Sequence, residues 1–456
     1  MNRQARAGAL MLVLLCLANA LNLADRVLLG VIQEPIKAEF GLSDFQLGLL
    51  GGPAFAVLYS LLGLPIAWLA ERSNRSAIVA GALALFSLMT AACGVAQNYL
   101  QLLLARIGVS VGEAGVSPPA LSLISDHYPA SRRGMVMSLY AVGGPMGALL
   151  ATVGAGMLAQ TQGWRMCFLV FGLLGLFVAL LIFILVPDRG RARAAGSPLR
   201  FGEALRHLSR RRSIWHICAG AAFTGACAMF IVQYLTSFFI RVHGLSLTQA
   251  SLVMGAMSIV AILGSFLGGF LADAASRRRP GSSPLVCAVA FLIAAPCYAL
   301  SFWSPGLAGS ILFLLCAAAC LNCYTGISYA ALSSVAPSTM RATTIALFTL
   351  ASNLIGYAFG PPVFGKLSDI IGAAEMARGG LALAYCAAHV AAAPCVAAAG
   401  AGLRWALSCS CILLLAAAFH YWRASRAVPL ELVDETPQQE ADAPAPADPR
   451  LSAAHH

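Results

Sequence analysis

The 456-residue chain is too poor in charge for a soluble protein: 59% of its residues are hydrophobic, 10% are charged and the mean hydropathy is +0.81. Soluble globular domains carry charge on about a quarter of their residues, so that class is excluded. The formal net charge of +11 does not indicate nucleic-acid binding, because the positive residues collect in alternate loops between apolar segments.

Twelve apolar stretches are long enough to cross a bilayer, for which a helix needs about 20 residues. They lie at about 8–33, 43–70, 77–96, 99–125, 133–159, 165–187, 214–240, 248–273, 282–303, 306–334, 342–372 and 403–422. The first begins like a signal peptide, with Arg3 and Arg6 before an apolar run and small residues at Ala18 and Ala20. Cleavage there would leave an odd number of spans, so we interpret 8–33 as an uncleaved transmembrane helix.

The loop charges predict how the chain is oriented in the membrane. Arginines precede the first span and follow every second span, whereas in the loop after the first span Lys37 is outnumbered by Glu34, Glu39 and Asp44. The positive-inside rule then places both termini in the cytoplasm. Lysine is nearly absent while arginine and alanine abound, which suggests a GC-rich bacterial genome and therefore a multi-pass protein of the cell's inner membrane.

Charged residues inside the predicted spans are the strongest indication of function, because each costs about 2.5–3.5 kcal/mol at the bilayer centre on insertion scales. Asp25 and Arg26 lie in the first span, and Arg106 and Glu113 lie in the fourth. Nearly two helical turns separate Arg106 from Glu113, about 10 Å along one face, which is too far for a direct pair. Asp25 between them could bond to Arg106 and leave Glu113 near a cavity.

We therefore expect Asp25 and Glu113 to carry protons and Arg106 and Glu113 to contact the substrate. When one of these carboxylates takes up a proton, it would release its arginine, which could then bind a negative group on the substrate. The alternative is a static ion network that locks the two helices together, although hydrophobic packing would serve that purpose at lower cost. Arg26 could instead extend toward the lipid headgroups.

Two short segments repeat one another about 200 residues apart. Each has a small residue, an acid four positions later at a helix end, and then arginines in a tight turn; they lie at 67–75 and 269–279. Pro129 and Arg133 recur as Pro337 and Arg341, in each case before an apolar helix. A repeat of this length indicates a tandem duplication, which is how many secondary transporters are built. The predicted fold is therefore an all-α membrane protein with twelve transmembrane helices in two pseudo-symmetric six-helix bundles.

The repeated charged turns lie at cytoplasmic helix ends, where an acid is stabilised by the N-terminus of a neighbouring helix. We expect them to form a gate that closes the cytoplasmic side, and simple anchoring at the membrane surface is the alternative. The residues assigned to this gate are Glu71, Arg72, Arg75, Arg133, Asp273, Arg277 and Arg341.

An arginine-rich stretch divides the chain. We predict an N-terminal bundle at 1–187, a cytoplasmic linker at 188–213, a C-terminal bundle at 214–426 and a disordered acidic cytoplasmic tail at 427–456. The alanine-rich segment 379–402 is predicted to be an external loop or a surface helix. The 14 cysteines are scattered through apolar segments without the spacing of a disulfide framework or a zinc site, so we interpret them as packing residues and expect no metal or cofactor.

The second half has few buried charges but several polar side chains within its predicted spans. If they face inward, they give the cavity a neutral wall opposite the charged one, which suits an amphipathic substrate. Each taken singly could instead serve packing or interhelical hydrogen bonding. The candidates for substrate contact are Gln233, Asn322, Tyr324, Asn353 and Tyr357.

The paired acid-and-arginine turns resemble the loop signature of the major facilitator superfamily over nearly the whole chain. The first copy departs from the signature at Ala67 and Glu71, where glycine and aspartate are usual, and the second at Ala274, where a basic residue is usual. Shorter motifs resemble the spinster branch of that family; they lie at 24–26, 48–50, 106–114, 125–126, 164–165 and 365–369.

This resemblance implies that Asp25 takes part in proton coupling and that Arg106 and Glu113 line a central cavity. Animal members of the branch are associated with lysophospholipids and sphingosine phosphate. We therefore expect a monomeric secondary transporter that moves a small amphipathic or anionic solute, such as a lysolipid, by proton-coupled alternating access.

The alternatives within transport are a carrier of small organic anions or sugar-like solutes and a drug-efflux transporter of the same fold. A membrane enzyme is not expected, because the chain has no HExxH or GxSxG motif. Without a GxxxxGK[ST] motif it has no site for a nucleotide-driven pump. A sensor would usually carry a larger soluble output domain.

Overall fold

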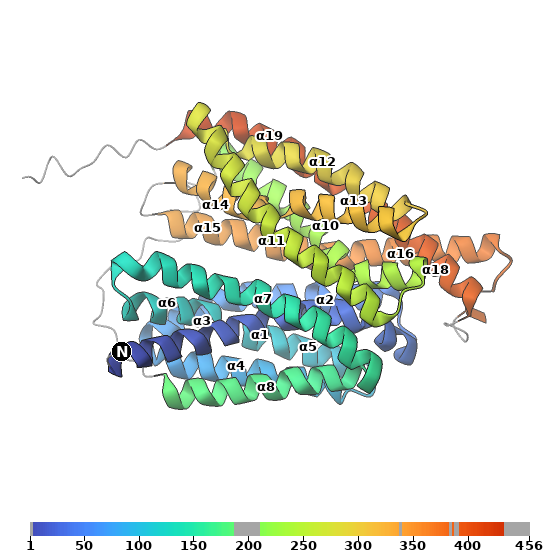
Figure 1. Ribbon diagram of the computed structural model, residues 1–456, viewed down its shortest axis with the longest axis horizontal. Helices are drawn as coiled ribbons and strands as arrows, with labels where there is room; N and C mark the ends of the chain where they lie inside the picture. The colour runs from blue at the N-terminus through green and yellow to red at the C-terminus, as the bar shows by residue number, and fades with distance from the viewer. Residues whose placement is uncertain (1–2, 187–209, 337–339, 383–384, 387–391, 433–456) are drawn as a thin grey trace, which may run out of the picture.

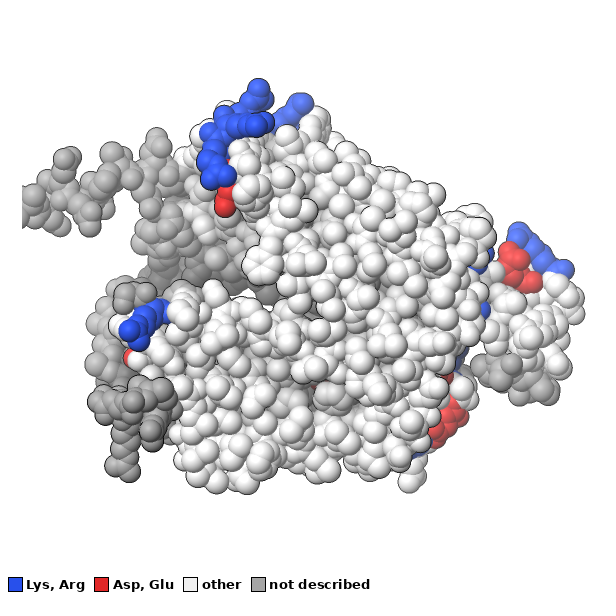
Figure 2. Space-filling model, viewed as in Figure 1, with Lys and Arg blue, Asp and Glu red and all other residues white. Residues whose placement is uncertain are grey.

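The computed structural model describes residues 3–186, 210–336, 340–382, 385–386 and 392–432. Within those ranges the regular structure is helical, and 12 helices or helix pairs are long and apolar enough to cross a membrane. The predicted fold class is therefore confirmed. Figure 2 shows the charged side chains gathered at the two ends of the long axis, with a broad uncharged belt between them.

The first six spans come from residues 3–185 (Figure 1). Their helices are α1 (Arg3–Phe40), α2 (Asp44–Gly51) continued by α3 (Pro53–Arg72), α4 (Arg75–Gly94), α5 (Tyr99–Glu113) continued by α6 (Ser117–His127), α7 (Ala130–Gln162) and α8 (Trp164–Leu185). Within this half α1 packs along α7, and α4 packs against both α5 and α8.

The last six spans come from residues 212–431 and form the other half of the molecule in Figure 1. Their helices are α10 (Arg212–His243), α11 (Leu247–Arg278), α12 (Pro284–Trp303), α13 (Leu307–Leu321) continued by α14 (Tyr324–Val335), α15 (Arg341–Leu350) continued by the π-helix η2 (Ala351–Tyr357) and α16 (Ala358–Arg378), and α18 (Ala393–Ser410) continued by α19 (Ile412–Glu431). Here α10 packs along α19, and α12 contacts α13 and α19.

The same turn follows the first helix of each half. Gly41 has a φ of +63° and Gly244 a φ of +67°, a conformation that favours glycine and ends a helix. Two residues later, Ser43 and Ser246 cap the next helix, each in a capping box with the glutamine three positions on. The duplication is thus visible in the backbone as well as in the charged loops.

Helix interruptions also recur between the halves. The fourth span breaks after Glu113, and the tenth span breaks after Leu321, 208 residues later. This is the offset of the Pro129 and Pro337 repeat. An interrupted helix leaves carbonyl groups without their helical partners, which is tolerated inside a membrane protein where neighbouring groups or a cavity satisfy them.

The predicted acidic tail begins too early. Glu431 belongs to α19, and its carboxylate accepts hydrogen bonds from the backbone N–H groups of Arg212 (3.0 Å) and Ser213 (3.2 Å) and from the Ser213 hydroxyl (2.5 Å). A carboxylate at this position accepts hydrogen bonds from N–H groups that have no partner within α10. Its negative charge also interacts favourably with the positive end of the α10 dipole. Residues 433–456 of the predicted tail and residues 188–209 of the predicted linker lie outside the described residues.

The prediction for the segment 379–402 is also wrong in part. Residues from Ala393 onward belong to the last candidate span, Ala393–Glu431, rather than to an external loop. Cys386 and Cys395 form a disulfide with a Cα–Cα distance of 5.5 Å, so not all cysteines are free packing residues. Nothing in an alanine-rich stretch marks these two cysteines as a pair, because no repeated cysteine spacing accompanies them.

The disulfide predicts the number of reactive thiols. Protein denatured without reductant should bind maleimide at 12 cysteines, and reduction should raise this to 14. Intact-mass spectrometry measures the difference directly. The Cys386→Ser/Cys395→Ser double variant is the control and should bind 12 under both conditions, whereas 14 adducts on unreduced wild-type protein would contradict the bond.

Candidate functional site

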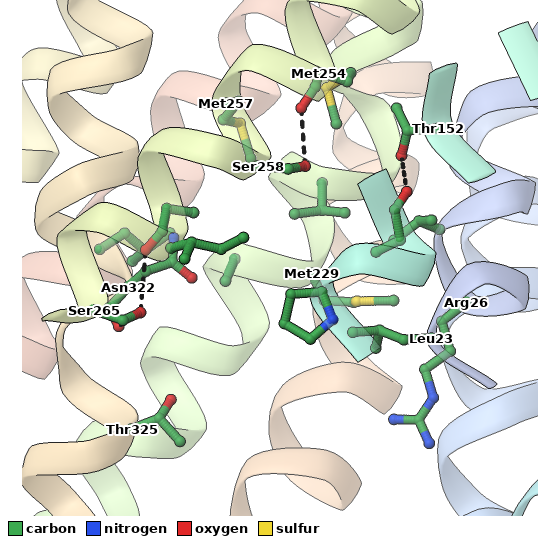
Figure 3. A pocket seen from close by; sticks show the side chains of 18 of the residues that line it. Leu23, Arg26, Thr152, Met229, Met254, Met257, Ser258, Ser265, Asn322 and Thr325 are labelled. Atoms are coloured by element: carbon green, nitrogen blue, oxygen red, sulfur yellow. Dashed lines mark hydrogen bonds between the residues drawn. The ribbon is translucent and has the colours of Figure 1, made fainter. Parts of the chain in front are cut away.

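A cavity of about 360 Å³ lies between the two halves (Figure 3). The first half contributes residues of α1, α3 and α7, and the second half contributes residues of α10, α11, α13, α14 and η2. Arg26 is the charged residue among the described side chains that line it. Most of the remaining surface is aliphatic or methionine, with the neutral polar groups of Ser258, Ser265, Asn322 and Thr325 on the side opposite Arg26.

Asp25 and Arg106 form a fully buried ion pair beside this cavity. The Nη1 atom of Arg106 lies 2.5 Å from Oδ2 of Asp25, and the Thr90 hydroxyl donates to Oδ1 at 2.9 Å. Asp25 and Arg106 are each 1% exposed. The predicted contact between the first and fourth spans is therefore confirmed, and both oxygens of the Asp25 carboxylate have partners.

Arg26 and Glu113 form the second ion pair of the site. The Nε atom of Arg26 lies 3.0 Å from Oε2 of Glu113, whose side chain is fully buried. The guanidinium also lies over the rings of Phe55 (4.7 Å) and Tyr59 (4.4 Å). Such cation–π contacts hold a desolvated arginine in place.

One oxygen of Glu113 is left without a partner. Within the described residues Oε1 of Glu113 is buried and has no hydrogen-bond donor. A buried acceptor that lacks a partner carries a desolvation cost, and a proton on the carboxyl group would relieve the charge that makes this cost high. The carboxylate of Glu113 is thus only half satisfied, whereas that of Asp25 is fully satisfied.

The structure places Arg26, rather than Arg106, at the cavity wall. Consecutive residues of a helix differ in direction by about 100°. Asp25 is turned to Arg106 of α5, whereas Arg26, which pairs with Glu113 of α5, also reaches the space between the halves. Arg106 and Glu113 are both held in ion pairs and lie outside the lining of this cavity, so their contact with a substrate stays a prediction.

The predicted contacts in the second half divide into two groups. Asn322, Tyr324 and Tyr357 line the cavity. Gln233 does not, because its Nε2 atom donates to the carbonyl oxygen of Leu47 at 2.8 Å and ties α10 to the first half.

Asn353 is likewise outside the lining, in the π-helical turn that also carries Tyr357. Sequence reasoning missed Met229, Met254 and Met257, which line the cavity but are indistinguishable from lipid-facing methionines in an apolar sequence.

The predicted cytoplasmic gate is only partly visible. The side chains of Glu71, Arg72, Arg133 and Arg341 lie outside the described ones. Arg75 pairs with Asp126 and donates to the Ser122 hydroxyl at 3.0 Å, and both partners belong to α6 of the same half. Among the described side chains, Asp273 and Arg277 are exposed and make no ion pair. Their gating role stays a prediction.

Known proteins share this sequence pattern and architecture. The model of the Major Facilitator Superfamily matches residues 15–361. An MFS-type efflux pump of Mycolicibacterium smegmatis is 31% identical over 357 residues, 78% of this chain and 83% of the pump. Protein spinster homolog 1 of Mus musculus is 29% identical over 387 residues, 79% of this chain and 73% of that protein.

A solved structure is similar over almost the whole chain. It is a bacterial homologue of the human lysosomal transporter spinster in an inward-facing, unoccupied conformation, with a TM-score of 0.87 and 32% sequence identity. The match covers 94% of this chain and 99% of the solved one. The nucleoside transporter NupG has the same fold at 14% identity and a TM-score of 0.71.

The Asp25–Arg106 pair predicts a strong coupling between the two positions. Arg106→Gln should lower the thermal unfolding midpoint, because removing one partner of a buried pair costs about 3–5 kcal/mol. Adding Asp25→Asn should recover much of that loss, since no unpaired charge then remains. Intrinsic tryptophan fluorescence gives the unfolding midpoints of the wild type, the two single variants and the double variant, which together form a double-mutant cycle. Strictly additive midpoint shifts would show that the two side chains do not interact.

Proposed function

Because the chain belongs to the major facilitator superfamily and is a transporter of the spinster type, we propose that it moves a small amphipathic or anionic solute by proton-coupled alternating access. The observation that carries this proposal is Arg26, the one cation among the described side chains that line the cavity. Its guanidinium pairs with the Glu113 carboxylate, of which one oxygen has no donor among the described residues.

The cavity lining favours a substrate with one negative group and an apolar body. Arg26 offers guanidinium donors to a phosphate or carboxylate. Met229, Met254 and Met257 offer flexible apolar surface, which adapts to chains of different shape. A lysolipid has this combination of charge and apolar surface.

Proton coupling follows from competition for Arg26. While Glu113 is ionised, it holds the guanidinium by a salt bridge. A proton on Glu113 removes that charge and leaves Arg26 available to an anionic substrate, so proton and substrate favour each other's binding. Asp25 lies one residue away and fixes the same turn of α1 to Arg106, so a change in its protonation would shift the helix that carries Arg26.

Two features support an inner-membrane orientation with both termini in the cytoplasm. Arginine-rich loops lie at the end of the molecule that holds the N-terminus, as the positive-inside rule requires of the cytoplasmic side. The Cys386–Cys395 disulfide lies beyond the end of α16, and disulfides persist in oxidising compartments such as the periplasm. The charged turns assigned above to the gate would then close the cytoplasmic side in the alternate conformer.

A second candidate is a carrier of a small soluble anion or an efflux transporter. Its support is the probable L-galactonate transporter of Escherichia coli and the mycobacterial efflux pump among the relatives. A guanidinium held over two aromatic rings would accept a soluble carboxylate as readily as a lipid phosphate. Substrate screening separates the two candidates.

Asp25→Asn should abolish proton-driven transport while leaving the protein folded. The measurement is substrate-dependent pH change in proteoliposomes, with lysophospholipids, sphingoid bases and organic anions screened separately. Glu39→Gln is the matched control, because it also converts an acid of α1 to its amide but lies at an exposed ion pair with Arg165. If the Asp25→Asn variant took up substrate under a proton gradient as fast as the wild type, Asp25 would have no role in proton coupling.

Arg26→Gln should weaken binding of an anionic amphiphile about tenfold or more, because it removes the cation in the cavity lining. The same variant should bind an uncharged amphiphile of equal chain length as the wild type does. Equilibrium binding to protein in nanodiscs measures both ligands. The control Arg165→Gln removes an exposed arginine outside the lining and should change neither affinity. If Arg26→Gln lost the same affinity for the charged and the uncharged ligand, the role assigned to Arg26 would be contradicted.

A further inference from the structure

Two exposed tryptophans meet in the second half, at the end of the molecule where α12 stops. Trp303 is the last residue of α12, and Trp405 belongs to α18. Their ring centroids are 4.8 Å apart in an edge-to-face arrangement, and the two residues are 44% and 45% exposed. The indole N–H of Trp303 donates to the Ser408 hydroxyl at 2.9 Å, which joins α12 to α18. Together with Arg404 and His243, described next, these residues are called the tryptophan cluster.

The spacing of tryptophans along α18 and α19 places this cluster at the level of the lipid headgroups. Trp422 follows Trp405 by 17 residues, which is about 26 Å of helix. The hydrocarbon core of a bilayer is about 30 Å thick, so the two side chains lie near its opposite faces. Tryptophan is enriched at such interfaces, because its ring is apolar and its N–H is polar. The exposed surface around Trp405 therefore meets lipid headgroups.

Arg404 lies beside Trp303 and has no counter-charge among the described residues. Its Cζ atom is 5.3 Å from the centroid of the Trp303 ring. Its Nε atom is buried and has no acceptor within the part of the chain that the structure describes, where no acidic side chain forms an ion pair with it. The sequences of α12, α13 and α18 contain no aspartate or glutamate that could supply one.

A second nitrogen of the cluster is also without a partner. His243 is the last residue of α10, its ring packs against Phe238 and Phe239, and the charge of Arg404 acts on it. Its Nε2 atom is buried and forms no hydrogen bond with any described residue. In the tautomer that carries hydrogen on Nε2, the neutral ring is a donor there. Arg404 and His243 thus present N–H groups from two helices, and the described residues offer no acceptor to either.

An anionic oxygen is the group that completes this arrangement. A guanidinium presents its donors in a plane that matches phosphate oxygens, and an indole ring beside it holds it in place without using those donors. A partly shielded arginine in a span is costly unless a headgroup or water reaches it. Basic pockets between transmembrane helices bind anionic lipid headgroups in this way. A zwitterionic headgroup fits less well, because it brings a cation of its own to a site that already has one.

We propose that the tryptophan cluster binds the phosphate of an anionic phospholipid. Arg404 and His243 donate to the phosphate oxygens, and Trp303 and Trp405 pack against the glycerol and the first part of the acyl chains. The bound lipid joins α10, α12 and α18. None of these four residues belongs to the described lining of the cavity between the halves, so the site does not depend on the proposed transport function.

The test is quenching of tryptophan fluorescence by lipids with brominated acyl chains, on the full chain in phosphatidylcholine nanodiscs. Brominated phosphatidylglycerol should reach half-maximal quenching at about a tenfold lower mole fraction than brominated phosphatidylcholine, because a bound lipid keeps bromine next to Trp303 and Trp405. Arg404→Gln should make the two curves coincide. Arg378→Gln is the control and should preserve the difference, since it removes an exposed arginine of α16 that pairs with Glu375.

Coincident curves for the wild-type protein would overturn the proposal without any variant, so the test stays decisive if Arg404→Gln does not fold. The Trp303→Phe/Trp405→Phe variant should lose the preference for phosphatidylglycerol while its other tryptophans are still quenched. A preference that survives in this variant or in Arg404→Gln would arise elsewhere and would overturn the assignment. Loss of the preference in an excess of inorganic phosphate would show a site for a free anion instead of a lipid, and would overturn it as well.

Discussion

The structure depends on the high free energy of an unpaired charge inside a membrane. Among the described residues, acidic and basic side chains buried in the spans have partners on other helices: Asp25 with Arg106, Arg26 with Glu113, and Asp44 with Arg241. Because burial makes each charge need its partner, these pairs determine which helices lie together. Apolar packing in lipid gives no comparable selectivity, since lipid chains are as apolar as the side chains they would replace.

The helix α1 carries charges with three different tasks. Asp25 fixes the helix to α5, Arg26 presents a cation to the cavity, and Glu34 reaches Arg241 in the other half. Eight residues separate Arg26 from Glu34, about 12 Å along the helix. Since a helix moves as a rigid element over that distance, a displacement at the cavity is also a displacement at the contact of Glu34 with Arg241.

Hydropathy and loop charge were sufficient to predict the helical fold, because bilayer thickness sets the length of every span. The contact between Asp25 and Arg106 was also predictable, since a charge in an apolar span needs a partner and few were available. The cavity position of Arg26 was not, because it depends on which way α1 is turned about its axis. Asp25 and Arg26 both form ion pairs with α5, but only Arg26 also lines the cavity.

The charged contact between the halves, in which Glu34 and Asp44 meet Arg241, escaped sequence reasoning for a different reason. Glu34, Lys37 and Asp44 stand near the end of a span, where charge is ordinarily explained by contact with water. Their burial follows only from the approach of α10 and α16, roughly 200 and 325 residues away in sequence. The Cys386–Cys395 disulfide was likewise unmarked, because two cysteines nine residues apart have no distinctive pattern.

The two sets of charges differ in how fully they are satisfied, and this difference separates their tasks. Between the halves, the Asp44 carboxylate has Arg241, Lys37 and Ser368 as partners, so it favours the one geometry in which these groups meet. Beside the cavity, Glu113 keeps one buried oxygen that has no donor among the residues the structure describes, so its environment leaves room for a proton. A fully satisfied cluster resists change, whereas a partly satisfied one responds to it. The helix α1 joins the two clusters, because Arg26 pairs with Glu113 at the cavity and Glu34 pairs with Arg241 at the contact between the halves. A site whose charge can change and a contact that resists change are thus coupled through one helix.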